Sequence, residues 1–221
     1  MGRELWSAVD GYICDLLVAP DQALDAALER SDTAGLPQIN VAPNQGKLLH
    51  LIARIHGARR ILEIGTLGGY STIWLARALP PDGQLITLEV EPKHAEVAQS
   101  NIERAGLAGV VTIRLGRAAD TLAELKAQGS DPFDLVFIDA DKTSGADYFS
   151  SALDLTRSGS VIIVDNVVRA GAVIDATSDD PAVQGTRRLN DVMAAEQRVS
   201  VTEVQTVGIK GYDGFALALV L

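Results

Sequence analysis

The chain has 221 residues, of which 47% are hydrophobic and 22% charged, and its formal net charge is −10. This length can bury one sizeable core and is short for two. No linker rich in Pro, Gly or Ser divides it, so we expect a single domain over residues 1–221. The acidic balance argues against broad binding to nucleic acid or to an anionic membrane, because both attract basic surfaces. It does not exclude a small acidic site that binds a cation.

Cysteine usage and hydropathy bear on the compartment. The single cysteine, Cys14, cannot form an internal disulfide and fits a reducing cytoplasm. It lies in a helical run, where we expect it to pack as a small apolar residue. The first residues lack the basic and apolar segments of a signal peptide, and no apolar run approaches 18 residues. We therefore expect a soluble cytoplasmic protein.

Helical patterns occupy the first quarter of the chain. Amphipathic segments are expected at residues 4–18 and 21–30, with Pro20 between them. We assign residues 1–42 to an N-terminal helical region that contacts a small-molecule ligand or a second copy of the chain. A looser stretch leads to a third helix at 44–56. Its expected core-facing stripe consists of Leu48, Leu49, Leu51, Ile52 and Ile55.

Strands and helices alternate after this point. Continuous apolar runs, such as 135–138 and 161–164, are typical of parallel strands covered on both faces. Two final strands, 199–207 and 214–221, are joined by a short connection, which predicts an antiparallel edge hairpin. The pattern indicates a doubly wound, mostly parallel α/β fold. The expected parallel strands are 60–65, 84–90, 110–115, 133–139 and 160–165, and the expected helices are 70–79, 93–105, 118–127, 145–157 and 181–196.

The most informative run is Arg60-Ile-Leu-Glu-Ile-Gly-Thr-Leu-Gly-Gly-Tyr-Ser71. An apolar strand breaks at Gly65 and leads into a helix, so backbone N–H groups can approach a ligand closely. The next strand ends in Glu89, 26 residues after Glu63, where such folds place a carboxylate that binds a ribose diol. A glycine turn that only connects two packed elements is the simpler alternative.

The glycine pattern restricts the cofactor. Gly65-x-x-Gly68-Gly69 does not match the dinucleotide fingerprint, and Gly46-Lys47-Leu48 is not a phosphate-binding loop. A nucleoside without phosphates fits better, with adenosine on Glu89 and an amino-acid tail near the first turn. S-adenosylmethionine answers that description.

Acidic residues gather where the fourth and fifth parallel strands end. Since ligands bind beyond the carboxyl ends of such strands, Asp139, Asp141, Asp165 and Asn166 should share one crevice. Their carboxylates would repel one another unless a cation neutralised them or one stayed protonated. A set of oxygen ligands without Cys or His suits Mg²⁺, Ca²⁺ or Mn²⁺ better than Zn²⁺. Alternatively, each Asp caps the helix or turn that follows it.

Together these motifs resemble the cation-dependent class I O-methyltransferases of the caffeoyl-CoA and catechol O-methyltransferase type, in a bacterial form. The resemblance runs from about Val41 to the C-terminus. It implies a Rossmann-like seven-stranded methyltransferase sheet, methyl transfer from S-adenosylmethionine to a hydroxyl of a catechol-like or phenolic acceptor, and a homodimer. The residues that carry it are 45–49, 62–66 with 69–71, 137–142, and Asp165 with Asn166.

The resemblance also implies residue roles. Asp139, Asp165 and Asn166 would ligate the cation, with Mg²⁺ the first expectation and Ca²⁺ or Mn²⁺ the alternatives. Lys142 would be the general base beside Asp139, although it could also be a surface lysine at a helix start. The implied cofactor contacts are Glu89 on the ribose, Ser71, Gly65 and Thr66 at the methionyl end, Glu63 at the base of the pocket, and Val41, Ala118, Asp139 and Asp141.

A bound cation would explain the chemistry, because coordination lowers the pKa of a phenol and two adjacent oxygens can chelate the ion. The chain departs from the plant caffeoyl-CoA enzymes after Asn166, where it reads Val-Val-Arg-Ala-Gly without their tryptophan. This puts a CoA thioester acceptor in doubt. Acceptor choice should depend on the N-terminal helices, residues 167–180 and Tyr212. Arg169 either meets an acidic group of the acceptor or points to solvent.

Other functions remain open. A tRNA hydroxyuridine methyltransferase is disfavoured by the net charge, and a short-chain nicotinamide-dependent reductase lacks its Tyr-x-x-x-Lys motif. A non-catalytic protein that binds S-adenosylmethionine is the third alternative. Tyr70 and Trp74 are expected to be packing residues. We assign no chemistry to His50, His56 or His94.

Overall fold

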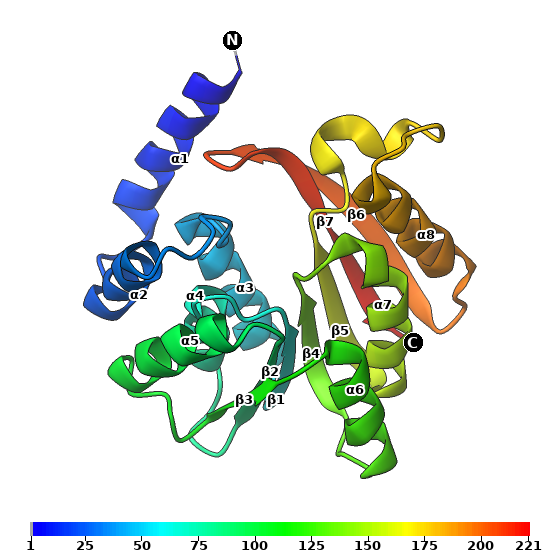
Figure 1. The fold of residues 1–221 in the computed structure, drawn as a ribbon, viewed down its shortest axis with the longest axis horizontal. Helices are drawn as coiled ribbons and strands as arrows, with labels where there is room; N and C mark the ends of the chain where they lie inside the picture. The colour runs from blue at the N-terminus through cyan, green and yellow to red at the C-terminus, as the bar shows by residue number, and fades with distance from the viewer. Residues whose placement is uncertain (1) are drawn as a thin grey trace.

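A seven-stranded sheet forms the centre of the computed structural model, which describes residues 2–221 (Figure 1). The strand order is β3-β2-β1-β4-β5-β7-β6, and β7 runs antiparallel to both of its neighbours, β5 and β6. The predicted doubly wound α/β sheet with an antiparallel edge hairpin is therefore confirmed. The strands are β1 (Arg60–Ile64), β2 (Gln84–Glu89), β3 (Val111–Leu115), β4 (Phe133–Ile138), β5 (Thr156–Asp165), β6 (Val199–Gly208) and β7 (Gly211–Val220).

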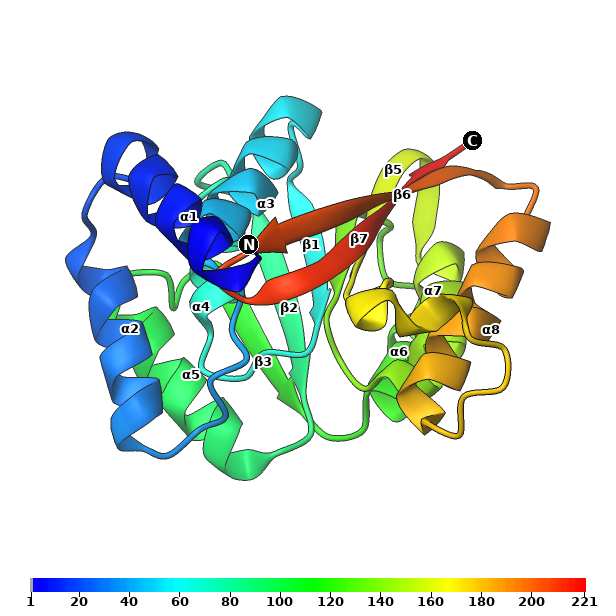
Figure 2. The ribbon, with the colours of Figure 1, turned by 90° about the horizontal axis from the view of Figure 1, so that it is seen from above.

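Helices cover both faces of the sheet (Figures 1 and 2). Side chains of β4 alternate between two cores: Leu135 and Phe137 pack on one face, and Val136 and Ile138 on the other. This double burial is why the strand reads as an unbroken apolar run. The first core includes α2 (Gln22–Thr33), α3 (Pro43–His56), α4 (Tyr70–Ala76) and α5 (Pro92–Arg104), and the second includes α6 (Ala118–Ala127), α7 (Gly145–Asp154) and α8 (Pro181–Ala195).

The N-terminal helix α1 (Arg3–Leu17) meets the tip of the β6–β7 hairpin (Figure 2). The buried carboxylate of Asp10 accepts hydrogen bonds from the Asn44 side chain at 2.9 Å and the Ile209 backbone N–H at 2.7 Å. One carboxylate thus joins α1, α3 and the hairpin. The hairpin turn is tighter than predicted, because Gly208 pairs with Gly211 across only two residues.

The predicted stripe on α3 is wrong at three of its five positions. Leu49 is 2% exposed, but Leu48 and Leu51 are exposed and Ile55 is 85% exposed. The buried face consists instead of Gly46, Leu49 and Ala53, because α3 approaches the indole of Trp74 closely. A Cβ at Gly46 would lie 2.4 Å from that ring. The side of α3 that packs against Trp74 is therefore built from small residues and not from the largest apolar ones.

Other differences concern element ends. The helix predicted at 70–79 ends at Ala76, and the one predicted at 145–157 ends at Asp154, so that β5 begins at Thr156. Helix α2 continues to Thr33. The segment predicted as the loop 167–180 contains short 3₁₀ turns, η2 (Arg169–Ile174), and another 3₁₀ turn, η1 (Lys142–Ser144), precedes α7.

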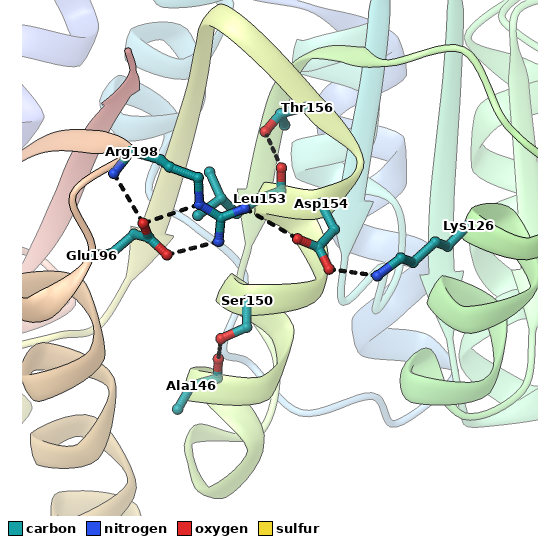
Figure 3. Close-up of polar contacts among 8 residues, drawn as sticks. All are labelled: Lys126, Ala146, Ser150, Leu153, Asp154, Thr156, Glu196 and Arg198. Carbon is teal, nitrogen blue, oxygen red and sulfur yellow. Dashed lines mark hydrogen bonds and ion pairs between the residues drawn. The ribbon is translucent and has the colours of Figure 1, made fainter.

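Surface ion pairs join the helices near the amino end of β5 (Figure 3). Asp154 contacts Lys126 at 2.7 Å and Arg198 at 3.3 Å, and Arg198 also contacts Glu196 at 2.7 Å. Exposed pairs of this kind contribute little to stability, so the fold depends on its two apolar cores. Within residues 2–221, no helix is long and apolar enough to cross a membrane.

Candidate active site

A cavity of about 800 Å³ lies at the carboxyl ends of the central strands. This volume is within the range typical of small-molecule sites. Most of the residues predicted to bind a cofactor or to act in catalysis line it. They are Val41, Gly65, Thr66, Ser71, Glu89, Ala118, Asp139, Asp141, Lys142 and Asn166.

The glycine turn forms part of the cavity lining. Gly65 has a φ of 101°, and a Cβ there would lie 2.0 Å from the carbonyl oxygen of Asp139. Its N–H donates to the Leu88 carbonyl at 3.0 Å, while the Asp139 N–H donates to the Ile64 carbonyl at 2.9 Å. Only glycine allows β1 to end this close to β4.

Glu89 forms part of the cavity wall, and backbone N–H groups hold its carboxylate. Oε2 accepts from Leu67 at 2.8 Å and Thr66 at 3.3 Å, and Oε1 accepts from the two residues after Glu89 at 2.9 and 3.0 Å. The ring Nδ1 of His94 lies 3.6 Å from Oε1. His94 was assigned no role from the sequence alone. Its position in the first turn of α5, just after the strand that ends in Glu89, could have indicated that it lies beside this carboxylate.

Glu63 was predicted to form the base of the pocket. Its side chain is fully buried behind Ser71 and does not itself line the cavity. Its fully buried carboxyl accepts hydrogen bonds from the hydroxyls of Ser71 at 2.6 Å, Thr87 at 2.7 Å and Thr72. Burial raises the pKa of Glu63 to about 7, against the opposing effect of the three hydroxyls. Glu63 is therefore connected to the cavity only through its hydrogen bond with Ser71, which lines the cavity.

The acidic end of the cavity joins the ends of β4 and β5, as predicted from their adjacency. The Nζ of Lys142 lies 3.0 Å from Asp139 Oδ1 and 3.1 Å from the Asp165 carbonyl oxygen. Asp165 is buried and borders a smaller adjoining pocket together with Asn166. Burial and the neighbouring charge of Asp139 raise the pKa of Asp165 to about 7.

Gln45 supports this cluster, and sequence reasoning gave it no role. Its Nε2 donates from α3 to Asp165 Oδ2 at 2.8 Å, while Oδ1 of Asp165 accepts from the Asn166 N–H at 2.9 Å. Asn166 itself has a φ of 60°, a left-handed conformation that asparagine tolerates better than most residues. The strand end thus turns sharply and presents Asn166 to the cavity.

Asp141 is the acidic residue for which the capping alternative holds. It accepts from the Ser144 N–H at 3.0 Å, the Thr143 hydroxyl at 2.9 Å and the Tyr148 hydroxyl at 2.6 Å. Burial opposes ionisation, but these hydrogen bonds outweigh it and lower the pKa of Asp141. Burial and Asp141 raise the pKa of Tyr148 to about 12. Tyr148 also lines the cavity and was not predicted.

Comparison with known proteins places this arrangement in a family. Residues 20–220 match the family model described as O-methyltransferase. The chain belongs to the O-methyltransferase family.

The similarity extends over the whole methyltransferase. It is 54% identical to the catechol O-methyltransferase of Niastella koreensis over 220 residues, covering 100% of both chains. It is 52% identical to the catechol O-methyltransferase of Mycobacterium tuberculosis, covering 96% of this chain and 94% of the relative. The solved O-methyltransferase from Bacillus cereus in complex with SAH has a TM-score of 0.97 and 55% identity, covering 99% of each chain. The O-methyltransferase TomG from Streptomyces achromogenes in complex with SAM has a TM-score of 0.96 and 53% identity, covering 100% of this chain and 99% of that one.

The donor set of the methyltransferase fits a hard cation. Within residues 2–221, no group of three or more His, Cys, Asp or Glu is arranged to hold a metal ion. The predicted set, however, is two carboxylates and an amide, Asp139, Asp165 and Asn166. These are oxygen donors of the kind that Mg²⁺ binds, and the charge of Lys142 offsets only part of the repulsion between Asp139 and Asp165.

The aromatic residues of α4 are buried as predicted, but Tyr70 also lines the cavity. Tyr70 and Trp74 are both buried, and the Trp74 carbonyl lies 3.1 Å from the Nδ1 of His50.

Replacing Glu89 should weaken binding of S-adenosylmethionine. We expect Glu89→Ala to reduce the binding free energy by roughly 1.5–3 kcal/mol, because hydrogen bonds to a charged group are lost. Calorimetric titration measures this, with the exposed Glu103→Ala on α5 as the matched control and thermal melts as a check on folding. Equal affinity of Glu89→Ala and the native protein would show that another group binds the ribose.

Glu63 should give the fold a specific pH dependence. A carboxyl whose pKa rises on folding stabilises the fold at low pH, and this contribution is lost as pH increases from about 4.5 through about 7. Between pH 4.5 and 8, the native protein should lose roughly 3 kcal/mol of unfolding free energy relative to Glu63→Gln. Urea unfolding across this range tests it, and two parallel stability curves would contradict it.

Proposed function

We propose that this O-methyltransferase transfers the methyl group of S-adenosylmethionine to a hydroxyl of a small catechol-like acceptor, with a divalent cation at Asp139, Asp165 and Asn166. The observation that carries the proposal is a single cavity with two unlike ends. Glu89 and the glycine turn lie at one end, and Asp139, Lys142 and Asn166 at the other. The names of the relatives, and the SAH and SAM in the solved structures, support it further.

The two ends have separate tasks in this proposal. Glu89 accepts hydrogen bonds from the ribose hydroxyls, while Ser71 and the backbone at Gly65 and Thr66 hold the methionyl end. A divalent cation bound to the acidic cluster would lower the pKa of the acceptor hydroxyl. Lys142 takes the proton from that hydroxyl once its own amine is neutral, because His94, the histidine on the cavity wall, lies beside Glu89 at the other end.

The transfer balances without a further reactant. A bond forms between the acceptor oxygen and the methyl carbon as the bond from that carbon to the sulfonium sulfur breaks. The electron pair of the broken bond stays on sulfur, so the product S-adenosylhomocysteine carries no charge on its sulfur. The amine of Lys142 holds the proton as an ammonium. Alignment of the oxygen with the methyl group is then the main contribution of the protein.

Metal removal tests the proposal most simply. Excess EDTA should abolish methyl transfer to catechol, and added Mg²⁺ should restore it, while the affinity for S-adenosylmethionine stays unchanged because Glu89 belongs to the other end. Asp165→Ala should lower the rate by several orders of magnitude, whereas the surface variant Asp154→Ala should retain it. Full activity in EDTA, or in Asp165→Ala, would exclude the cation at this cluster.

The homodimer remains part of the proposal. Leu5, Val9, Tyr12 and Leu16 are all exposed and recur at helical spacing along α1, which gives that helix an uncovered apolar stripe. Leu51 and Ile55 of the neighbouring α3 are exposed as well. A second copy of the chain that packed on these side chains would remove them from water.

Sedimentation velocity measures this directly. The native protein should sediment as a dimer at micromolar concentration, and Leu16→Glu should shift it to monomer, because a charge would then be buried at the interface. The exposed polar change Asp15→Asn, on the same helix, should leave the dimer intact. A native monomer would contradict the assignment of α1 to the interface.

A further inference from the structure

Arg169 lies on the wall of the cavity, at the end that contains Asn166. Its side chain is partly buried, and its Nε is shielded from solvent without a hydrogen-bond acceptor among residues 2–221. None of the ion pairs within that part of the chain includes it. A buried donor without an acceptor is costly, so its position at a cavity wall points to a ligand that accepts its hydrogen bond.

The backbone holds Arg169 in an uncommon conformation. Its φ is 54° and that of Ala170 is 55°, both in the left-handed region that residues with side chains seldom adopt. Asp213, on β7, fixes this turn: its Oδ1 accepts from the N–H groups of Val168 and Arg169, at 3.0 Å each. Strain of this kind persists where surrounding contacts impose it, and it gathers at ligand sites.

Several other charged groups on the cavity wall have partners, and the remaining carboxylates there, Glu91 and Asp147, would repel an anion. Lys142 contacts Asp139, Glu89 accepts four backbone N–H groups, and Asp141 accepts from Ser144, Thr143 and Tyr148. The second arginine on the wall, Arg117, is exposed at the start of α6. Arg169 is thus a half-buried cation at the acceptor end, in a protein with a net charge of −10.

We propose that Arg169 binds an anionic group of the acceptor, and that the preferred acceptors are catechols with a ring or side-chain carboxylate. This inference rests on the proposed function. A guanidinium can donate two parallel hydrogen bonds to a carboxylate. Arg169 follows Asn166 by three residues, so their Cα atoms are at most about 11 Å apart. A one-ring acceptor can therefore meet the acidic cluster with its hydroxyls and Arg169 with its carboxylate.

Steady-state kinetics with matched acceptors tests the inference. The probes are 3,4-dihydroxybenzoate and its uncharged amide, with Mg²⁺ and saturating S-adenosylmethionine. The native enzyme should favour the carboxylate by about tenfold or more in kcat/KM, and Arg169→Gln should reduce this preference to near unity, mainly through KM. Arg169→Lys should keep part of the preference, because it keeps the charge without the planar fork. The control Arg114→Gln, at an exposed position on β3, removes one charge elsewhere and should leave kcat/KM unchanged for both acceptors.

The outcomes separate this inference from the proposed function. Methylation of both acceptors by the native enzyme without preference would overturn the role of Arg169 and leave the proposed function standing. Equal losses on both acceptors in Arg169→Gln would likewise overturn it, because a purely structural residue would act in that way. A native enzyme that methylates no catechol at all would contradict the proposed function itself.

Discussion

The close approach of β1 and β4 at Gly65 and Asp139 is the constraint on which the site depends. Backbone hydrogen bonds join the end of β1 to both β2 and β4, and no side chain fits between Gly65 and the carbonyl of Asp139. The carboxyl ends of β1, β2 and β4 therefore lie side by side at the same edge of the sheet. Their terminal residues then face a common cavity, which is where ligands bind in open parallel sheets.

The two ends of the cavity are held in different ways. Four backbone N–H groups fix Glu89, and two of them belong to the glycine turn, so the proposed cofactor end is set by the fold of the main chain. Side chains from separate elements fix the acidic end, where Lys142 contacts Asp139 and Gln45 contacts Asp165. A rigid nucleoside end and an acceptor end defined by side chains would allow related enzymes to keep one donor while changing acceptors.

Sequence patterns predicted the parts of the site that lie at strand ends. Glu89, Asp139 and Asp165 each follow an apolar run, and the order of elements places such ends together. Gln45, His94 and Tyr148 were missed because they reach the site from helices, and helical periodicity does not say which element a side chain will meet. Gly46 shows the same limit in the core. The apolar pattern of α3 indicated its largest side chains as buried, whereas contact with Trp74 selects the smallest.

The central claim is that a nucleoside site at Glu89 adjoins an acceptor site at Asp139 and Asn166 in one cavity. The affinity of a synthetic ligand in which adenosine is joined to catechol by a short linker measures this most directly. With Mg²⁺ present, it should bind at least about 100-fold more tightly than either half alone, because the second contact becomes intramolecular. An affinity no greater than that of adenosine alone would contradict the account.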